Sequence, residues 1–215
     1  MNFKNLGIWR RKKLTEYGIR EFYYFSFIDN VEGILQNGIL SKNEVENRNL
    51  NYNSFADEAV QERRHTRSIR LTDGKFHNIH DLVPLYLTPK TPTLFARKEN
   101  QGSIFFAVVQ SSILWDKGIE FAFSDGNAAS ENTQFYYSLN KLDMIPWEVI
   151  RADYWKDFDD GKRKRNSEFL IYPHVPIERI CQFVVNSVEN RSYIDNIKQK
   201  YGINIEVKID HSFFF

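Results

Sequence analysis

The order of the apolar segments constrains the fold of this chain more than any other feature of its sequence. Short runs of aromatic and β-branched residues predict strands at 22–27, 104–110, 169–172 and 203–209. Asp29 or Asn30 can cap a helix that Gly38 ends, and residues 191–201 predict a second helix before the last strand. Because helices and strands do not alternate one for one, we expect an α+β fold.

The length of the chain favours a single domain. A chain of 215 residues can bury a full core without a second domain, so we expect one domain over 1–215. Residues 1–20 contain a basic run and precede any strong strand signal, which predicts a solvated N-terminal arm, flexible or helical. Residues 41–57 are polar and rich in Asn, and they predict a long loop of the kind that often forms a functional lid.

The net charge and the cysteine content limit the binding partners that the protein can have and the cellular compartment in which it acts. The net charge is only +1, so affinity for a nucleic acid must come from local basic patches. The one cysteine, Cys181, cannot form an internal disulfide, which favours a buried structural thiol and a reducing, cytoplasmic setting. No run approaches the roughly 20 apolar residues that a membrane helix needs, so we expect no membrane association.

Several familiar catalytic motifs are missing from the sequence. The glycines form neither GxGxxG nor a Walker pattern, and no GxSxG segment occurs, which disfavours Rossmann, P-loop and acyl-transfer chemistry. His77, His80 and Asp81 could suggest a metal site, but the surrounding residues predict a strand or loop, in which this spacing does not bring the imidazoles together. We therefore expect no metal ion.

Glu168 is the acidic residue in the most unusual setting. It lies between a basic run, 162–165, and the apolar strand predicted at 169–172. The run would attract a polyanion, although a solvated charge run beside an ordinary strand explains the pattern equally well. A carboxylate with an arginine cluster at 63–70 suits chemistry at a sugar carbon, where the acid stabilises a cation and arginines hold a pyrophosphate.

Several segments match one protein family in order and spacing. They are 22–30, 33–35 with Gly38, 61–64, 79–86 with Pro89 and Pro92, 123–125, 150–155 and 164–170. Together they resemble the DarT family of DNA ADP-ribosyltransferase toxins over nearly the whole chain after about residue 21. The resemblance implies an ADP-ribosyltransferase-like fold, with central mixed or antiparallel sheets and flanking helices.

The family resemblance also implies a reaction and its partners. The family transfers ADP-ribose from NAD, a co-substrate, to a base of single-stranded DNA, and it releases nicotinamide. Its toxins are commonly neutralised by a macrodomain antitoxin, so we expect single-stranded DNA and a DarG-like antitoxin as partners of a monomeric enzyme. Two alternatives stay open: transfer to RNA or protein, and a non-catalytic module that binds single-stranded nucleic acid.

Roles for individual residues follow from the same resemblance. Glu168 resembles the catalytic glutamate, and Arg64 resembles the arginine that contacts NAD and assists proton removal from the base. The positions that resemble the NAD pocket are Tyr24, Phe25, Ser26, Gly33 and Ser41. Residues 127–167 resemble the segment that recognises the substrate, which makes Lys162, Arg163 and Arg165 candidates for contacts with DNA phosphates.

Three positions depart from the family pattern. Tyr24 and Phe27 stand where histidine is common, and Thr93 stands where a methionine often occurs. The departures concern the side of the site that faces nicotinamide and base, so the identity of the base, guanine or thymine, stays open. They are departures from the thymine-modifying pattern, which slightly favours guanine.

Overall fold

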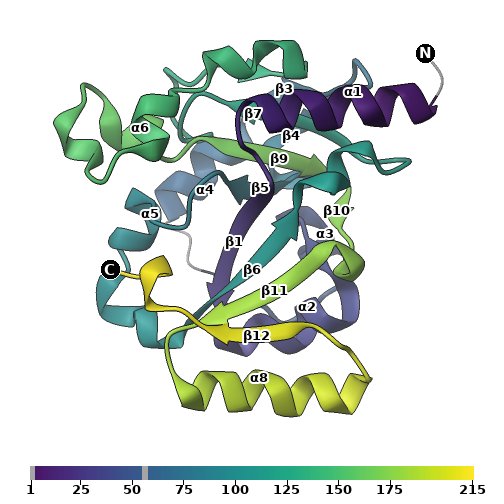
Figure 1. Cartoon of the computed structure of the whole chain (residues 1–215), viewed down its shortest axis with the longest axis vertical. Helices are drawn as coiled ribbons and strands as arrows, with labels where there is room; N and C mark the ends of the chain where they lie inside the picture. The colour runs from purple at the N-terminus through teal and green to yellow at the C-terminus, as the bar shows by residue number, and fades with distance from the viewer. Residues whose placement is uncertain (1–2, 55–57) are drawn as a thin grey trace.

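A computed structural model describes residues 3–54 and 58–215, and a mixed eight-stranded sheet forms its centre (Figure 1). The strand order is β12-β11-β6-β1-β5-β9-β7-β8, in which β11 and β12 are parallel and the other paired neighbours are antiparallel. The strands are β1 (Glu21–Phe27), β5 (Val83–Tyr86), β6 (Ile104–Gln110), β7 (Glu120–Ser124), β8 (Phe135–Tyr136), β9 (Glu168–Tyr172), β11 (Ile180–Val185) and β12 (Glu206–Ile209).

Two small sheets and short helices surround this sheet. The small sheets pair β2 (Ile39–Leu40) with β10 (His174–Val175), and β3 (Ser68–Arg70) with β4 (Phe76–Asn78). The helices are α1 (Phe3–Glu16), α2 (Val31–Asn37), α3 (Lys42–Asn47), α4 (Glu58–His65), α5 (Pro92–Phe95), α6 (Trp147–Arg151), α7 (Gly161–Lys164) and α8 (Val188–Tyr201). In Figure 1, α8 runs along the β12 edge and α1 lies at the opposite end of the molecule. None of the helices in the described parts of the chain is long and apolar enough to cross a membrane.

The two faces of the main sheet bury different cores. One face carries the largest core, to which β9 contributes Phe169 and Ile171. The opposite face carries two smaller cores, one over β6 and β11 and one that includes Leu170 of β9. Because side chains alternate along a strand, Glu168 lies on the face of Leu170. Tyr86, the cross-strand partner of Glu168, packs against the small core over β6 and β11. Glu168 therefore lies between that core and the small core that includes Leu170.

The sheet divides at the junction of β1 and β5. β1 pairs with β6 along all seven of its residues, but it meets β5 only at Tyr23 and Tyr86. Pro84 in β5 has no backbone N–H to donate, which suits a strand whose edge is partly unpaired. Beyond Tyr23 the pairing of β1 with β6 continues, but its pairing with β5 does not.

Two predicted segments differ from the structure. The basic arm is the helix α1, which packs against the body: Leu14 is buried, and Arg10 donates to the carbonyl of Leu114 and lies over the ring of Phe121. The predicted loop 41–57 contains α3, because Ser41 caps that helix by accepting a hydrogen bond from the Glu44 N–H. Its residues 55–57 and residues 1–2 of the arm lie outside the described residues.

Candidate active site

Glu168, the first residue of β9, is buried and hydrogen-bonded at both carboxylate oxygens. Its side chain is 1% exposed. Oε2 accepts from Nη2 of Arg64 at 3.0 Å, and Oε1 accepts from the backbone N–H of Ala128 at 3.2 Å. A buried carboxylate needs partners of this kind to remain charged, and two partners at different oxygens also fix its orientation.

The loop after β7 supplies the Ala128 N–H and is tied to the backbone of Glu168. The Glu168 N–H donates to Oγ of Ser124 at 3.0 Å, and that hydroxyl donates to the carbonyl of Gly126 at 2.6 Å. A Cβ at position 126 would overlap the Arg163 side chain, so any larger residue there would require Arg163 to shift from its place against the loop. The same hydrogen bonds therefore hold both Glu168 and the loop after β7 in position.

Two arginines hold the same loop from either side. Arg67 donates to backbone carbonyls of the loop, including those of Ala128 at 3.1 Å and Thr133 at 2.9 Å, and lies over the ring of Phe135. Arg163 donates to Oδ1 of Asp125 at 2.8 Å and forms a second ion pair with Asp160. Both guanidinium groups are thus bound by groups of the protein itself. Burial lowers the pKa of Arg67.

On the β1 side, aromatic rings border the acid. Tyr86, the cross-strand partner of Glu168, stacks on Phe25 with ring centroids 5.4 Å apart. Burial, and then the charge of Glu168, raise the pKa of the Tyr86 phenol, so it remains a neutral hydrogen-bonding group. Tyr24 points to the other face of β1, where its hydroxyl lies 3.3 Å from that of Tyr52.

The loop before α4 is fastened to the end of β1. The side chain of Asn30 bonds both backbone groups of Asn53, accepting from its N–H at 2.9 Å and donating to its carbonyl at 2.8 Å. The same amide donates to the hydroxyl of Ser26 at 2.9 Å, and that serine is fully buried. Ser26 thus connects β1 with the loop that was predicted to act as a lid.

The structure distributes the predicted NAD-pocket residues over three places. Phe25 shares the face of Glu168, while Tyr24 and Ser26 lie on the opposite face of β1. Gly33 is an exposed residue of α2, and Ser41 is the buried N-cap of α3. No contact between described residues joins Gly33 or Ser41 to Glu168, so their place in the pocket stays a prediction.

The three residues predicted to contact DNA differ in whether their charged groups are free to bind a phosphate. Lys162 is exposed, and Arg163 is occupied by Asp125 and Asp160. Arg165 is 5% exposed and donates to four backbone carbonyls, those of Lys90, Val149, Ile150 and Ala152. The prediction that Arg165 contacts DNA phosphates is therefore corrected: its guanidinium holds the interior together, and burial lowers its pKa.

Important groups of the site were missing from the sequence-based set. The sequence marks Arg67 only as one member of the arginine cluster at 63–70, and Tyr86 and Ser124 only as members of the segments 79–86 and 123–125. The Ala128 N–H left no signal, because every residue except proline has a backbone N–H. Within the described residues, no group of three or more His, Cys, Asp and Glu side chains is arranged to hold a metal ion.

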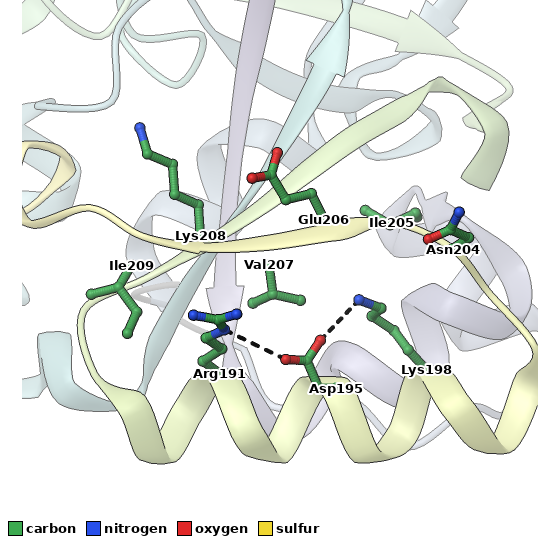
Figure 2. Close-up of a pocket in the computed structure, with 9 residues that line it drawn as sticks. All are labelled: Arg191, Asp195, Lys198, Asn204, Ile205, Glu206, Val207, Lys208 and Ile209. Carbon is green, nitrogen blue, oxygen red and sulfur yellow. Dashed lines mark hydrogen bonds and ion pairs between the residues drawn. The ribbon is translucent and has the colours of Figure 1, made fainter.

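A separate hollow of about 550 Å³ lies between α8 and β12, at the far edge of the sheet (Figure 2). Asp195 of α8 forms ion pairs there with Lys198 at 2.9 Å and with Arg191 at 3.6 Å. Figure 2 shows these charges directed at one another beneath Val207. The hollow is distant in the strand order from β9 and contributes nothing to the surroundings of Glu168.

Comparison with known proteins identifies the family. Residues 23–215 match the family model described as "ssDNA thymidine ADP-ribosyltransferase, DarT". The chain belongs to the DarT family. As a member it is a DNA ADP-ribosyltransferase, which confirms the resemblance and the enzyme class inferred from the sequence.

Relatives in the DarT family align over most of this chain. A DNA ADP-ribosyl transferase of Thermus sp. (strain 2.9) is 31% identical over 173 residues, which cover 77% of this chain and 80% of that protein. A transferase–glycohydrolase fusion protein of Thermosipho africanus is 33% identical over 204 residues, which cover 91% of this chain and 50% of the fusion.

Solved DarT structures share the fold. Thermus sp. 2.9 DarT in complex with ADP-ribosylated single-stranded DNA superposes with a TM-score of 0.80 at 25% identity, over 91% of this chain and 96% of that one. Its complex with NAD+ has the same fold, with a TM-score of 0.76 at 24% identity and coverage of 91% and 98%. The α+β, ADP-ribosyltransferase-like fold expected from the sequence is thereby confirmed.

Proposed function

We propose that this chain transfers ADP-ribose from NAD to thymine in single-stranded DNA and releases nicotinamide. The observation that carries the proposal is the setting of Glu168: a buried carboxylate, held at both oxygens, beside the division between β1 and β5. The donor is taken from the Thermus sp. 2.9 relative, which binds NAD+, and thymine from the family description. We therefore propose thymine as the target base, although Tyr24, Phe27 and Thr93, which depart from the family pattern, slightly favoured guanine.

Glu168 acts on the ribose of NAD in this proposal. The bond between the nicotinamide nitrogen and the ribose carbon breaks, and its electron pair leaves with neutral nicotinamide. Positive charge then develops on the ribose, where a fixed carboxylate stabilises it without having to reorganise. A ring nitrogen of the base forms the new bond to that carbon and gives up its proton to water.

Arg64 supports the reaction electrostatically. Its guanidinium is bound to Glu168 and has no vacant site that could take a proton from the base. We assign it to orienting the carboxylate and to contacting NAD. The Arg64 side chain is 12% exposed, so part of it reaches solvent beside the buried acid.

NAD lies against β1 in this proposal. Phe25 and Tyr86 offer stacked rings to the dinucleotide on the Glu168 face of β1, beside the point where the pairing of β1 with β5 ends. Gly33 and Ser41 remain in the proposal as more distant contacts of the dinucleotide.

The biological setting is a toxin and its antitoxin. The Thermosipho africanus relative joins a transferase to a DNA ADP-ribosyl glycohydrolase in one protein, which supports a DarG-like glycohydrolase as the partner of this chain. We place the enzyme in the cytoplasm, where its one cysteine stays reduced. We propose that residues 1–215 act as one domain, since a chain of this length can bury one full core, and that the enzyme is a monomer.

Nicotinamide release tests the proposal. The wild-type protein should release nicotinamide from NAD faster when a thymine-containing oligonucleotide is added, and Glu168→Ala should abolish the increase. Equal release with RNA or with protein, and no increase with DNA, would move the activity to those acceptors. No release under any condition would refute the assignment of Glu168 to NAD chemistry.

A further inference from the structure

The peptide bond between Asn127 and Ala128 decides whether the second oxygen of Glu168 has a donor. In a trans peptide the C=O and the N–H point in opposite directions, so the carbonyl of Asn127 and the N–H of Ala128 are fixed together. The Asn127 carbonyl accepts from the N–H of Ser130 at 3.0 Å and from the hydroxyl of Thr133 at 2.7 Å. These two bonds direct the Ala128 N–H at Glu168, to which it donates at 3.2 Å.

The guanidinium of Arg67 holds the loop after β7 in this shape. It donates to backbone carbonyls of the loop, among them those of Ala128, Ser130 and Thr133. Ser130 and Thr133 are also the two residues that orient the Asn127 carbonyl, so one side chain binds both of them. Several carbonyls that meet at one point need a side chain with several donors, and the guanidinium of arginine carries five N–H groups in a fixed plane.

A single turn of the chain presents Arg64 and Arg67 to the two oxygens of Glu168. The Arg67 N–H donates to the carbonyl of Arg64 at 3.2 Å, and the Arg67 carbonyl accepts from the N–H of Ile79 at 3.0 Å. Arg64 donates directly to Oε2 of the acid, whereas Arg67 reaches Oε1 only through the loop and its Ala128 N–H. The turn that follows α4 therefore controls both oxygens of the carboxylate.

We propose that Arg67 is a positioning residue for the transfer reaction: it holds the loop after β7 so that the Ala128 N–H stays on Glu168 and keeps the carboxylate in one orientation. The inference rests on the proposed transfer from NAD, and it adds a residue that acts through the loop, since its donors are bound to backbone carbonyls. Misplacing a catalytic group by about 1 Å can lower a rate by about 100-fold. Loss of Arg67 should therefore slow the reaction more than it weakens the binding of NAD.

Nicotinamide release at a saturating concentration of oligonucleotide tests the role of Arg67. Arg67→Met removes every hydrogen-bond donor of the side chain and keeps an unbranched apolar stem. We expect kcat to fall by about 10- to 100-fold and KM for NAD to change by less than about threefold. Arg67→Lys keeps a charge and three donors, so it should recover part of kcat. A kcat for Arg67→Met within about twofold of the wild-type value would overturn the inference.

Arg10→Met is the matched control. Arg10 also donates to a backbone carbonyl, that of Leu114, and also lies over a phenylalanine ring, that of Phe121. Both partners belong to the largest core, on the face of the main sheet opposite to Glu168. The control variant loses similar contacts but should keep kcat within about twofold of the wild-type value. An equal loss of kcat in both variants would overturn the inference, because a general loosening of the fold would then explain it.

The double variant shows whether Arg67 acts through the acid. In a Glu168→Gln background the carboxylate that Arg67 positions is already gone. Arg67→Met should therefore lower the remaining rate of nicotinamide release by less than about twofold in that background. Equal fold losses with and without the Glu168 carboxylate would overturn the inference, since Arg67 would then act independently of the acid.

Hydrogen exchange followed by mass spectrometry tests the clamp without NAD or DNA. Peptides that cover residues 125–134 should exchange faster in Arg67→Met than in the wild-type protein, and Arg10→Met should leave their exchange unchanged. Unchanged exchange in Arg67→Met would overturn the inference. If that variant does not fold, Arg67→Lys takes its place in each comparison, with a loss of kcat of about 3- to 10-fold expected. A wild-type protein whose loop depends on Arg67 but that releases no nicotinamide would contradict the proposed function alone.

Discussion

Arg64 and Glu168 form a largely buried ion pair of 3.0 Å across 104 residues of sequence. The arginine comes from the C-terminal turn of α4, and the acid begins β9. The second oxygen of Glu168 accepts the Ala128 N–H, so the carboxylate is fixed from two independent segments. The proposed chemistry depends on this oriented carboxylate.

Glu168→Gln should remove catalysis while largely preserving the fold. The amide has nearly the same shape as the carboxylate, but it carries no charge to stabilise a cationic ribose. We expect the rate of nicotinamide release to fall by about 10²- to 10³-fold, as for loss of one electrostatic stabiliser. Glu178→Gln is the control, because Glu178 is exposed and distant in the strand order, in the segment between β10 and β11. A Glu168→Gln protein with near wild-type rates would contradict the role of the acid.

Arg64→Ala should destabilise the protein through the charge that it leaves behind. Removing one partner of a buried ion pair typically costs about 3–5 kcal/mol, and the partial exposure of Arg64 puts this case near the lower value. Denaturant unfolding measures the loss. The same substitution in a Glu168→Gln background should cost clearly less, because no buried charge is then stranded. Equal costs in both backgrounds would show that the pair is not coupled.

Arg165→Met should lower stability and leave the salt dependence of DNA binding unchanged. The Arg165 guanidinium satisfies carbonyls around the C-terminal end of α6, where a helix leaves its last carbonyls without partners. We expect the free energy of unfolding to fall by about 3 kcal/mol or more, since several buried acceptors lose their donor. Lys162→Met should show the reverse pattern, with stability retained. A reduced salt slope for a folded Arg165→Met protein would restore its role as a DNA contact.

His80 should make the stability depend on pH. Burial, then the charges of Lys42, Arg64 and His65, lower the pKa of His80 from 6.5 to about 4, and its buried Nε2 has no hydrogen-bond partner among the described residues. Between these values the unfolded chain binds a proton that the folded chain does not. Stability should therefore fall as the pH drops from 6.5 toward 4, by at most about 1.4 kcal/mol per pH unit.

His80→Phe is the matched variant for this pH dependence. It keeps a ring of similar size in the buried position and cannot titrate. Unfolding followed at several pH values should give a flatter profile for the variant between pH 6.5 and 4. Parallel profiles for the two proteins would assign the pH dependence to other groups.

The sequence was sufficient to predict the strand that carries Glu168 but not what surrounds it. An apolar run after an acid is a local pattern, and β9 contains the predicted strand 169–172 but begins one residue earlier, at Glu168. Whether each side chain of the basic run 162–165 is buried or exposed depends on partners elsewhere in the chain. Arg165 lies inside because α6 presents unpaired carbonyls to it, and Arg163 is occupied by Asp125 and Asp160. A charge pattern alone cannot distinguish such partners from solvent.

The division between β1 and β5 was also beyond local prediction. Pro84 marks β5 as irregular, yet only the tertiary structure shows that the described residues of β1 and β5 pair at one position, Tyr23 with Tyr86. The helix α3 was missed because the polar composition of 41–57 lacks an apolar face, and its Ser41 cap fixes the start of the helix.

Mass spectrometry of oligonucleotides tests the central claim most directly. Single-stranded oligonucleotides that each contain one thymine, one guanine or neither would be incubated with NAD and the wild-type or Glu168→Ala protein. We predict that the wild-type protein adds one ADP-ribose mass to the thymine oligonucleotide only, and that the variant adds none. An adduct on guanine alone would contradict the choice of base. An unmodified panel, or an equal adduct with Glu168→Ala, would contradict the account of the site.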